Sequence, residues 1–187
     1  MTSGMKVLVV GQGAREHAIA HALKLSLSVS EVHAIPGNPG MGHEAICHDV
    51  KTSDHEAIGR LVAQLKFDLA VIGPEAEIVA GLGDHLRELG CAVFAPSKAA
   101  ARLESSKIFS KELMQSAGVP TARFEIVKST DEVKAKLSNF TPPYVLKADG
   151  LAAGKGVFIC ESEEELLNAA YRVFEERMFG SSGDRAI

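Results

Sequence analysis

The sequence has few cysteines, and none of them stand in a paired spacing. Its three cysteines, Cys47, Cys91 and Cys160, lie singly within apolar runs. Structural zinc sites and the disulfide frameworks of small secreted domains need closely spaced or numerous cysteines. The pattern therefore excludes both kinds of site, and we expect three reduced cysteines in the core of a cytoplasmic protein.

Long apolar runs and an excess of basic charge are also lacking. The longest apolar stretches, such as residues 69–72, have the length of a strand, and no early segment joins a basic region to a long apolar run. We therefore expect neither a membrane span nor a signal peptide. The formal net charge is −4, and no basic face indicates a nucleic-acid partner. Small molecules are the expected ligands.

The first part of the chain alternates strand-sized apolar runs with helical patterns. We expect strands at residues 6–10, 32–35, 69–72 and 91–95, a weaker strand at 46–50, and helices at 15–25, 54–66 and 78–89. This alternation is typical of βαβ units that form a parallel sheet covered on both faces. The sequence therefore predicts a doubly wound, Rossmann-like α/β domain over residues 1–103.

A different pattern follows Pro96 and Ser97. Residues 104–123 form a linker in which Ser105 or Ser106 is a suitable N-cap for a helix over 106–117. After it we expect a strand at 124–127, a helix at 130–138, a strand pair around 147–156 and a helix at 162–174. The sequence therefore predicts a small α+β unit over residues 124–187.

The most informative segment is the loop at 147–156, which reads Lys-Ala-Asp-Gly-Leu-Ala-Ala-Gly-Lys-Gly. Its glycines let backbone N–H groups turn toward an anion, and Lys147 and Lys155 add charges that suit a polyphosphate. It is not a Walker P-loop, because three residues instead of four separate Gly150 from Gly154 and no Ser or Thr follows the lysine. We therefore expect a nucleotide held by another mechanism, with an ordinary hairpin as the alternative.

A second glycine turn follows the first strand. The segment Gly11-Gln12-Gly13-Ala14-Arg15-Glu16-His17 leads into a helix, whose N-terminus can bind phosphate. Glu16 stands where the dinucleotide fingerprint has its third glycine, and no acidic residue ends the second strand. NAD binding by residues 5–95 is therefore a minor alternative, and Arg15 suits contact with an anion.

Two further turns follow strands at the same edge of the predicted sheet. They are Pro36-Gly37-Asn38-Pro39-Gly40 and Gly73-Pro74-Glu75. Ligands of open α/β sheets bind at the carboxyl ends of the strands, so we expect these turns to converge with the first glycine turn. Glu75 can accept hydrogen bonds from a sugar hydroxyl or an amine, or can simply favour the start of a helix.

Taken in chain order, these motifs and Ser105-Ser106-Lys107 resemble the amino-terminal part of the glycinamide ribonucleotide synthetase (phosphoribosylamine–glycine ligase) family of the ATP-grasp superfamily. The resemblance extends over residues 5–187. It implies a pre-ATP-grasp domain followed by a small ATP-grasp lid subdomain. It also implies that ATP, with Mg²⁺ or Mn²⁺, phosphorylates glycine, and that 5-phosphoribosylamine then attacks the glycyl phosphate. The products would be glycinamide ribonucleotide, ADP and phosphate, in purine biosynthesis.

The resemblance further implies which residues bind which substrate. ATP would be bound by Lys107, Lys147, Gly150, Leu151, Ala152, Ala153, Gly154, Lys155 and Gly156. Phosphoribosylamine would be bound by Gly11, Gly13, Arg15, Asn38, Pro74 and Glu75. The family usually has Asn and Gly where this chain has Gln12 and Ala14, which affects the expected geometry around the phosphate.

The family also has parts that we expect beyond Ile187: the rest of the ATP-grasp domain, with its acidic metal ligands, and a carboxy-terminal domain. We therefore expect neither a catalytic residue nor a metal ligand within these residues, and no turnover by this chain alone. Two alternatives remain open. One is another ATP-grasp carboxylate–amine ligase or carboxylase, and the other is a non-catalytic nucleotide-binding module.

Overall fold

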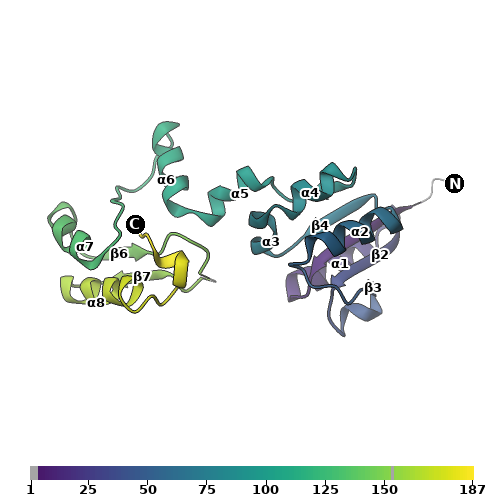
Figure 1. Ribbon diagram of the computed structural model, residues 1–187, viewed down its shortest axis with the longest axis horizontal. Coiled ribbons are helices and arrows are strands. Elements are labelled where there is room, and N and C mark those ends of the chain that lie inside the picture. The colour runs from purple at the N-terminus through teal and green to yellow at the C-terminus, as the bar shows by residue number, and fades with distance from the viewer. Residues whose placement is uncertain (1–3, 153) are drawn as a thin grey trace. The chain divides into compact units, whose positions relative to one another are not determined.

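The structure is a computed structural model that describes residues 4–152 and 154–187. The chain divides into two compact units, Met1–Ala101 and Arg102–Ile187, which are described separately (Figure 1). In the described part of the chain, no helix is both long enough and apolar enough to cross a membrane.

A parallel sheet of five strands forms the centre of the first unit, in the order β3-β2-β1-β4-β5. The strands are β1 (Met5–Gly11), β2 (Val29–Pro36), β3 (Ile46–Cys47), β4 (Leu69–Ile72) and β5 (Ala92–Phe94). The predicted doubly wound α/β fold is therefore confirmed. The strand order reverses between β1 and β4, and ligands of such sheets bind beyond the carboxyl ends of the strands at this point.

Helices cover both faces of this sheet. They are α1 (Ala14–Lys24), α2 (His55–Leu65), α3 (Glu75–Ala80) and α4 (Leu82–Glu88). Successive residues of β1 enter different clusters, since Leu8 packs with Ile58 and Val9 packs with Ala20. Because alternate strand residues point to opposite faces, a strand covered on both sides reads as a continuous apolar run.

Three details of the first unit differ from expectation. The single helix predicted at 78–89 is two helices, because Gly81 has a φ of 103° and ends α3. The strand predicted at 46–50 contains only Ile46 and Cys47. Cys47 was expected in the core but is exposed, since β3 is a two-residue strand at the edge of the sheet.

Cys91 and Cys160 are buried as expected, and burial raises the pKa of both thiols.

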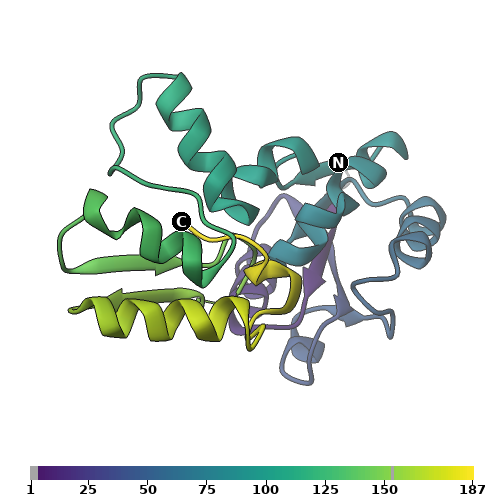
Figure 2. The same ribbon diagram turned by 60° about the vertical axis from the view of Figure 1, so that its left-hand side comes forward.

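The second unit packs helices against a β-hairpin. Its elements are α6 (Lys107–Ser116), α7 (Thr130–Lys136), β6 (Tyr144–Lys147), β7 (Val157–Cys160) and α8 (Glu163–Phe174), while α5 (Lys98–Ser105) spans the boundary between the units. Leu146 of β6 and Leu166 of α8 belong to one buried cluster. Figure 2 shows α8, in yellow-green, running along the hairpin. The predicted strand pair around the lysine loop is therefore confirmed.

Residues 124–127 do not form the predicted strand. Within the described residues, only Val127 of this segment has a bridge partner, which is Ala186, and Ala186 also bridges Ala148 beyond the end of β6. A strand needs a continuous neighbour to satisfy its backbone groups. Here the neighbour reaches one residue of the segment, so the pairing stays a single bridge.

Candidate functional site

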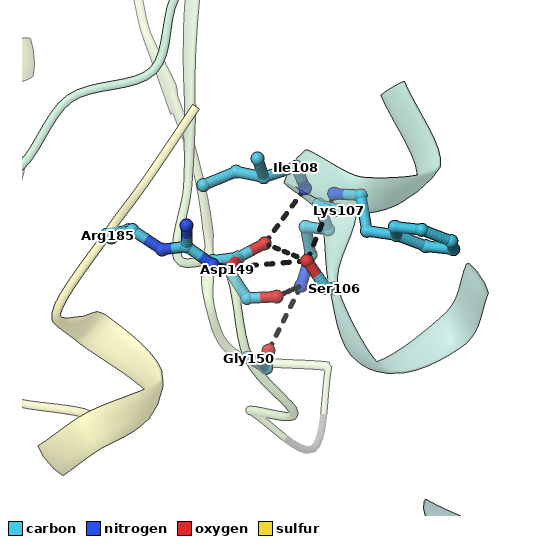
Figure 3. A network of polar contacts seen from close by, with 7 residues as sticks. Ser106, Lys107, Ile108, Asp149, Gly150 and Arg185 are labelled. Carbon is cyan, nitrogen blue, oxygen red and sulfur yellow. Dashed lines mark hydrogen bonds and ion pairs between the residues drawn. The ribbon is translucent and has the colours of Figure 1, made fainter. Parts of the chain in front are cut away.

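Asp149 joins the glycine-rich loop to the start of α6. Its buried carboxylate accepts hydrogen bonds from the N–H of Ile108 (2.8 Å) and the hydroxyl of Ser106 (3.0 Å). Arg185 forms an ion pair with it at 3.0 Å (Figure 3). The Ser106 hydroxyl also accepts a hydrogen bond from Phe109 N–H (3.1 Å) as the N-cap of α6. Because the first N–H groups of a helix lack helical partners and favour negative charge, Asp149 takes the place that a ligand anion would have there.

Three lysines give the second unit a positive region. Lys107 Nζ donates to the carbonyl oxygens of Gly150 (3.1 Å) and Asp149 (3.4 Å) (Figure 3). Lys147 ends β6 and lines the same cavity as Lys111. Burial, and then the neighbouring charge of Lys147, lower the pKa of Lys111. Ammonium groups placed in this way suit a polyphosphate ligand.

The base of the glycine-rich loop is fixed by Gly150. A Cβ at this position would lie 2.5 Å from Ser182 Oγ and 2.8 Å from Ser182 Cα, so no larger residue fits without movement of the backbone. The N–H of Gly150 donates to the carbonyl of Ser182 (3.0 Å). Farther along the loop, Gly154 has a φ of 77° and Lys155 is exposed, whereas Ala153 lies outside the described residues. The loop therefore has a fixed base and an exposed lysine.

In the first unit, Arg15 joins two of the predicted turns. Its Nε donates to Glu16 (2.9 Å), one terminal nitrogen donates to Glu75 (3.0 Å), and the other donates to the Gly73 carbonyl. A guanidinium carries five N–H groups, so these three bonds to described residues leave two for another acceptor. The side chains of Arg15 and Glu75 are 57% and 51% exposed. Both are therefore accessible to a ligand.

Asn38 links the turn at residues 36–40 to the glycine turn at residues 11–17. Its side-chain nitrogen donates to the carbonyl of Gln12 (2.9 Å), and its side-chain oxygen accepts from the N–H of Met41 (3.0 Å). Pro74 is the N-cap residue of α3, directly before Glu75. The predicted convergence of the three turns at the carboxyl edge is therefore confirmed. Ligand binding by Gly11, Gly13 and the other residues of these turns stays a prediction.

Glu16 has a structural role that sequence reasoning missed. Its buried carboxylate accepts a hydrogen bond from the N–H of Gly13 (2.8 Å), and a Cβ at Gly11 would lie 2.5 Å from its Cγ. The sequence did carry a signal, because an acidic residue three positions after an N-cap is the pattern of a capping box.

The described residues include no group of three or more His, Cys, Asp or Glu side chains that could hold a metal ion.

Two family models match the chain. Residues 5–104 match the N domain of phosphoribosylglycinamide synthetase, and residues 105–187 match its ATP-grasp (A) domain. The chain belongs to the phosphoribosylglycinamide synthetase family. The lysine loop therefore lies in the ATP-grasp domain of this family, and the converging turns lie in its N domain.

Curated members of the phosphoribosylglycinamide synthetase family are similar over nearly the whole chain. The phosphoribosylamine–glycine ligase of Streptomyces coelicolor is 49% identical over an alignment of 175 positions, which covers 92% of this chain and 42% of the relative. The enzyme of Rhodopirellula baltica is 43% identical over an alignment of 191 positions, which covers 99% of this chain and 44% of the relative. The chain thus spans less than half the length of these relatives.

Solved structures agree with the family assignment. The phosphoribosylamine–glycine ligase of Thermotoga maritima superimposes with a TM-score of 0.78 and 34% identity, covering 97% of this chain and 42% of that one. The biotin carboxylase domain of 2-oxoglutarate carboxylase from Hydrogenobacter thermophilus has a TM-score of 0.74 and 24% identity, covering 98% of this chain and 44% of that one. The second likeness shows a shared fold only.

At the converging turns, the pKa of the Glu75 carboxyl lies below its usual value. A hydrogen bond from its own backbone N–H, followed by the bond from Arg15, lowers the pKa of this carboxyl. A carboxylate of this kind stabilises the fold above its unfolded pKa, and its contribution is lost as the pH falls through the lower folded value. We expect Arg15→Gln to raise the pKa of Glu75 partway toward its usual value, as measured by NMR titration of the carboxyl carbon. An unchanged pKa would show that Arg15 does not hold this carboxylate in solution.

The Asp149 network predicts a large loss of stability on substitution. Asp149→Ala leaves the N–H of Ile108 and the hydroxyl of Ser106 without their buried acceptor, so we expect a loss of about 3 kcal/mol in the free energy of unfolding of the second unit, measured in urea. Asp184→Ala is the matched control, because its pair with Arg177 is exposed and should cost about 1 kcal/mol or less. Equal losses in the two variants would contradict the role given to Asp149.

Proposed function

We propose that this chain supplies the ATP-binding lid and the phosphoribosylamine-binding domain of a phosphoribosylamine–glycine ligase. In the proposed reaction, ATP phosphorylates the carboxylate of glycine, and the amine of 5-phosphoribosylamine attacks the glycyl phosphate. This gives glycinamide ribonucleotide, ADP and phosphate, in the cytoplasm and within purine biosynthesis. The observation that carries the proposal is the match of both family models, over residues 5–104 and 105–187.

The second unit would act on the phosphates of ATP. An unactivated carboxylate is a poor acyl donor, so the enzyme must neutralise the polyphosphate and keep water from the intermediate. We assign phosphate contacts to Lys107 and Lys147, with the backbone of residues 150–156 closing over them and Lys155 as a further cation. Lys107 is bonded to two neutral carbonyls in the structure. A phosphate would be a stronger acceptor for it, because ionic hydrogen bonds are about twice as strong as neutral ones.

The first unit would hold phosphoribosylamine. We place its phosphate near Gly11, Gly13 and Arg15, where the start of α1 and the two remaining N–H groups of Arg15 can donate to it. Asn38, Pro74 and Glu75 would line the sugar and the amine. The exposed Glu75 carboxylate can accept a hydrogen bond from a ribose hydroxyl or from the amine. Mg²⁺ or Mn²⁺ would accompany ATP.

ATP binding can be tested on the chain itself. We expect calorimetry to detect ATP binding, and Lys147→Gln to weaken it about 10- to 100-fold, because a charge-assisted phosphate contact contributes about 1.5–3 kcal/mol. Lys134→Gln is the control, since Lys134 is exposed on α7 and does not line the cavity that Lys147 lines. If the Lys147 variant and the unsubstituted chain bound ATP with equal affinity, Lys147 would not contact its phosphates.

Binding of a sugar phosphate distinguishes a phosphoribosylamine–glycine ligase from another ATP-grasp enzyme. Ribose 5-phosphate is a stable probe, and we expect Arg15→Gln to weaken its binding about tenfold while leaving ATP affinity unchanged. Arg60→Gln, an exposed arginine on α2, serves as the control. A chain that binds ATP but not ribose 5-phosphate would favour a carboxylase or a different ligase. Binding of NAD to the first unit would contradict the assignment of that domain.

A further inference from the structure

The helix α3 carries Glu75 at its start, yet the residue that α3 buries is acidic. Of its six residues, all within the described part of the chain, Glu77 is the one that is buried, and Ile78 packs only partly against the core. Acidic side chains are rarely buried unless they are paired. The N-cap residue Pro74 makes no side-chain hydrogen bond, and Gly81 ends the helix. The position of α3 therefore depends strongly on the contacts of Glu77.

Both oxygens of the Glu77 carboxylate bind residues at the start of α2. Oε1 accepts a hydrogen bond from the hydroxyl of Thr52 (3.0 Å), and Oε2 lies 2.8 Å from Nε2 of His55. The side chains of Glu77 and His55 are 11% and 23% exposed. Hydrogen bonds that are shielded from water in this way are stronger than exposed ones. The carboxylate thus attaches α3 to α2 at two points.

The two partners of Glu77 are themselves held in place. Asp54 lies between them in the sequence and is the N-cap of α2, its side chain accepting the N–H of Ala57 (2.9 Å). The helix α2 buries Ile58 and Val62 in the core cluster that also contains Leu8 of β1. The start of α2 is therefore a fixed support for α3.

The other end of this chain of contacts is the ion pair at the converging turns. Glu75 lies two residues before Glu77 on α3, and its carboxylate is 3.0 Å from Arg15. Both side chains of the pair are more than half exposed, and an exposed ion pair contributes little stability by itself. Arg15 is held on its own side by Glu16 (2.9 Å). Glu75 must therefore be held by its helix.

We propose that Glu77 is a positioning residue, which binds Thr52 and His55 and thereby holds α3 so that Glu75 lies beside Arg15. It acts through Glu75 and does not contact the ligand. A ligand that bonds to both Arg15 and Glu75 needs the two groups at a fixed separation. The inference rests on the proposed function only where it concerns a sugar phosphate, because the placement of Glu75 can be measured without any ligand.

The test separates the hydrogen bonds of Glu77 from its charge. In Glu77→Ala both bonds are lost, so we expect the pKa of Glu75 to rise toward its usual value as its bond from Arg15 weakens. Glu77→Gln keeps both bonds at either charge of His55, because the amide can turn its oxygen toward either partner and the Thr52 hydroxyl can donate or accept. Loss of a nearby negative charge should then leave the pKa of Glu75 unchanged or slightly lower. NMR titration of the carboxyl carbon measures both variants.

The affinity for ribose 5-phosphate at neutral pH gives a second measurement. We expect Glu77→Ala to weaken binding about fivefold, because a displaced Glu75 loses a hydrogen bond to the sugar. Glu77→Gln should bind at least as tightly as the unsubstituted chain, because one negative charge fewer favours an anion. Val32→Ala is the control for stability, since Val32 is buried in the core cluster of Val9, to which α3 does not contribute. It should leave both measurements unchanged in the folded protein.

Two results would overturn the proposal. One is a pKa of Glu75 that stays unchanged or falls in Glu77→Ala, and the other is an equal rise in Val32→Ala, since Glu77 would then contribute stability alone. Thr52→Val removes one bond and keeps the shape of the side chain, so it should give a smaller rise and decides the matter if Glu77→Ala does not fold. If the unsubstituted chain does not bind ribose 5-phosphate, the proposed function fails, while the pKa of Glu75 still tests the role of Glu77.

Discussion

The buried carboxylate of Asp149 is the interaction on which the candidate nucleotide site depends. A charged group is costly to bury unless it is fully hydrogen-bonded, and the chain supplies Ile108, Ser106 and Arg185 as its partners. These partners bring together the start of α6, the glycine-rich loop and the last residues of the chain. Lys107 follows the N-cap of α6 directly, so the same contact holds its ammonium group at the carbonyl of Gly150.

The first unit uses a similar arrangement. The carboxylate of Glu16 accepts the N–H of Gly13 at the start of α1, as that of Asp149 accepts the N–H of Ile108 at the start of α6. In each unit an internal carboxylate binds a helix-terminal donor and fixes a glycine turn. A cation beside it, Arg15 or Lys107, is then held in place. This division of roles separates the groups that shape the turns from the groups that we assign to ligand phosphates.

Much of this fold could be predicted from local patterns. The continuous apolar run of β1 indicated a strand covered on both faces, and the turns after β1, β2 and β4 were expected to meet because parallel strands end at the same edge. The hairpin was evident because two apolar runs flank the lysine loop. These predictions needed only the periodicity of the chain and the positions of its turns.

The predictions that proved wrong depend on contacts between residues distant in sequence, or on a single residue that ends a helix or a strand. Residues 124–127 have strand-like composition, but their neighbour is Ala186, which no local pattern could identify. Cys47 lies in an apolar run whose strand proved too short to cover it. Gly81 divides a helix whose apolar periodicity continues past it. Asp149 was part of the recognised loop, yet its role depends on Arg185, 36 residues away.

Backbone amide NMR can locate the bound nucleotide on the chain. Titration with ATP should shift the amides of Lys107, Lys147, Gly150 and Gly154 in a saturable manner, while those of Gly11 and Gly13 stay unchanged. Such a result would place the phosphates at the lysine loop of the ATP-grasp domain. Saturable shifts at Gly11 and Gly13, with none at the lysine loop, would contradict ATP binding at the lysine loop and place the nucleotide at the glycine turn of the first unit.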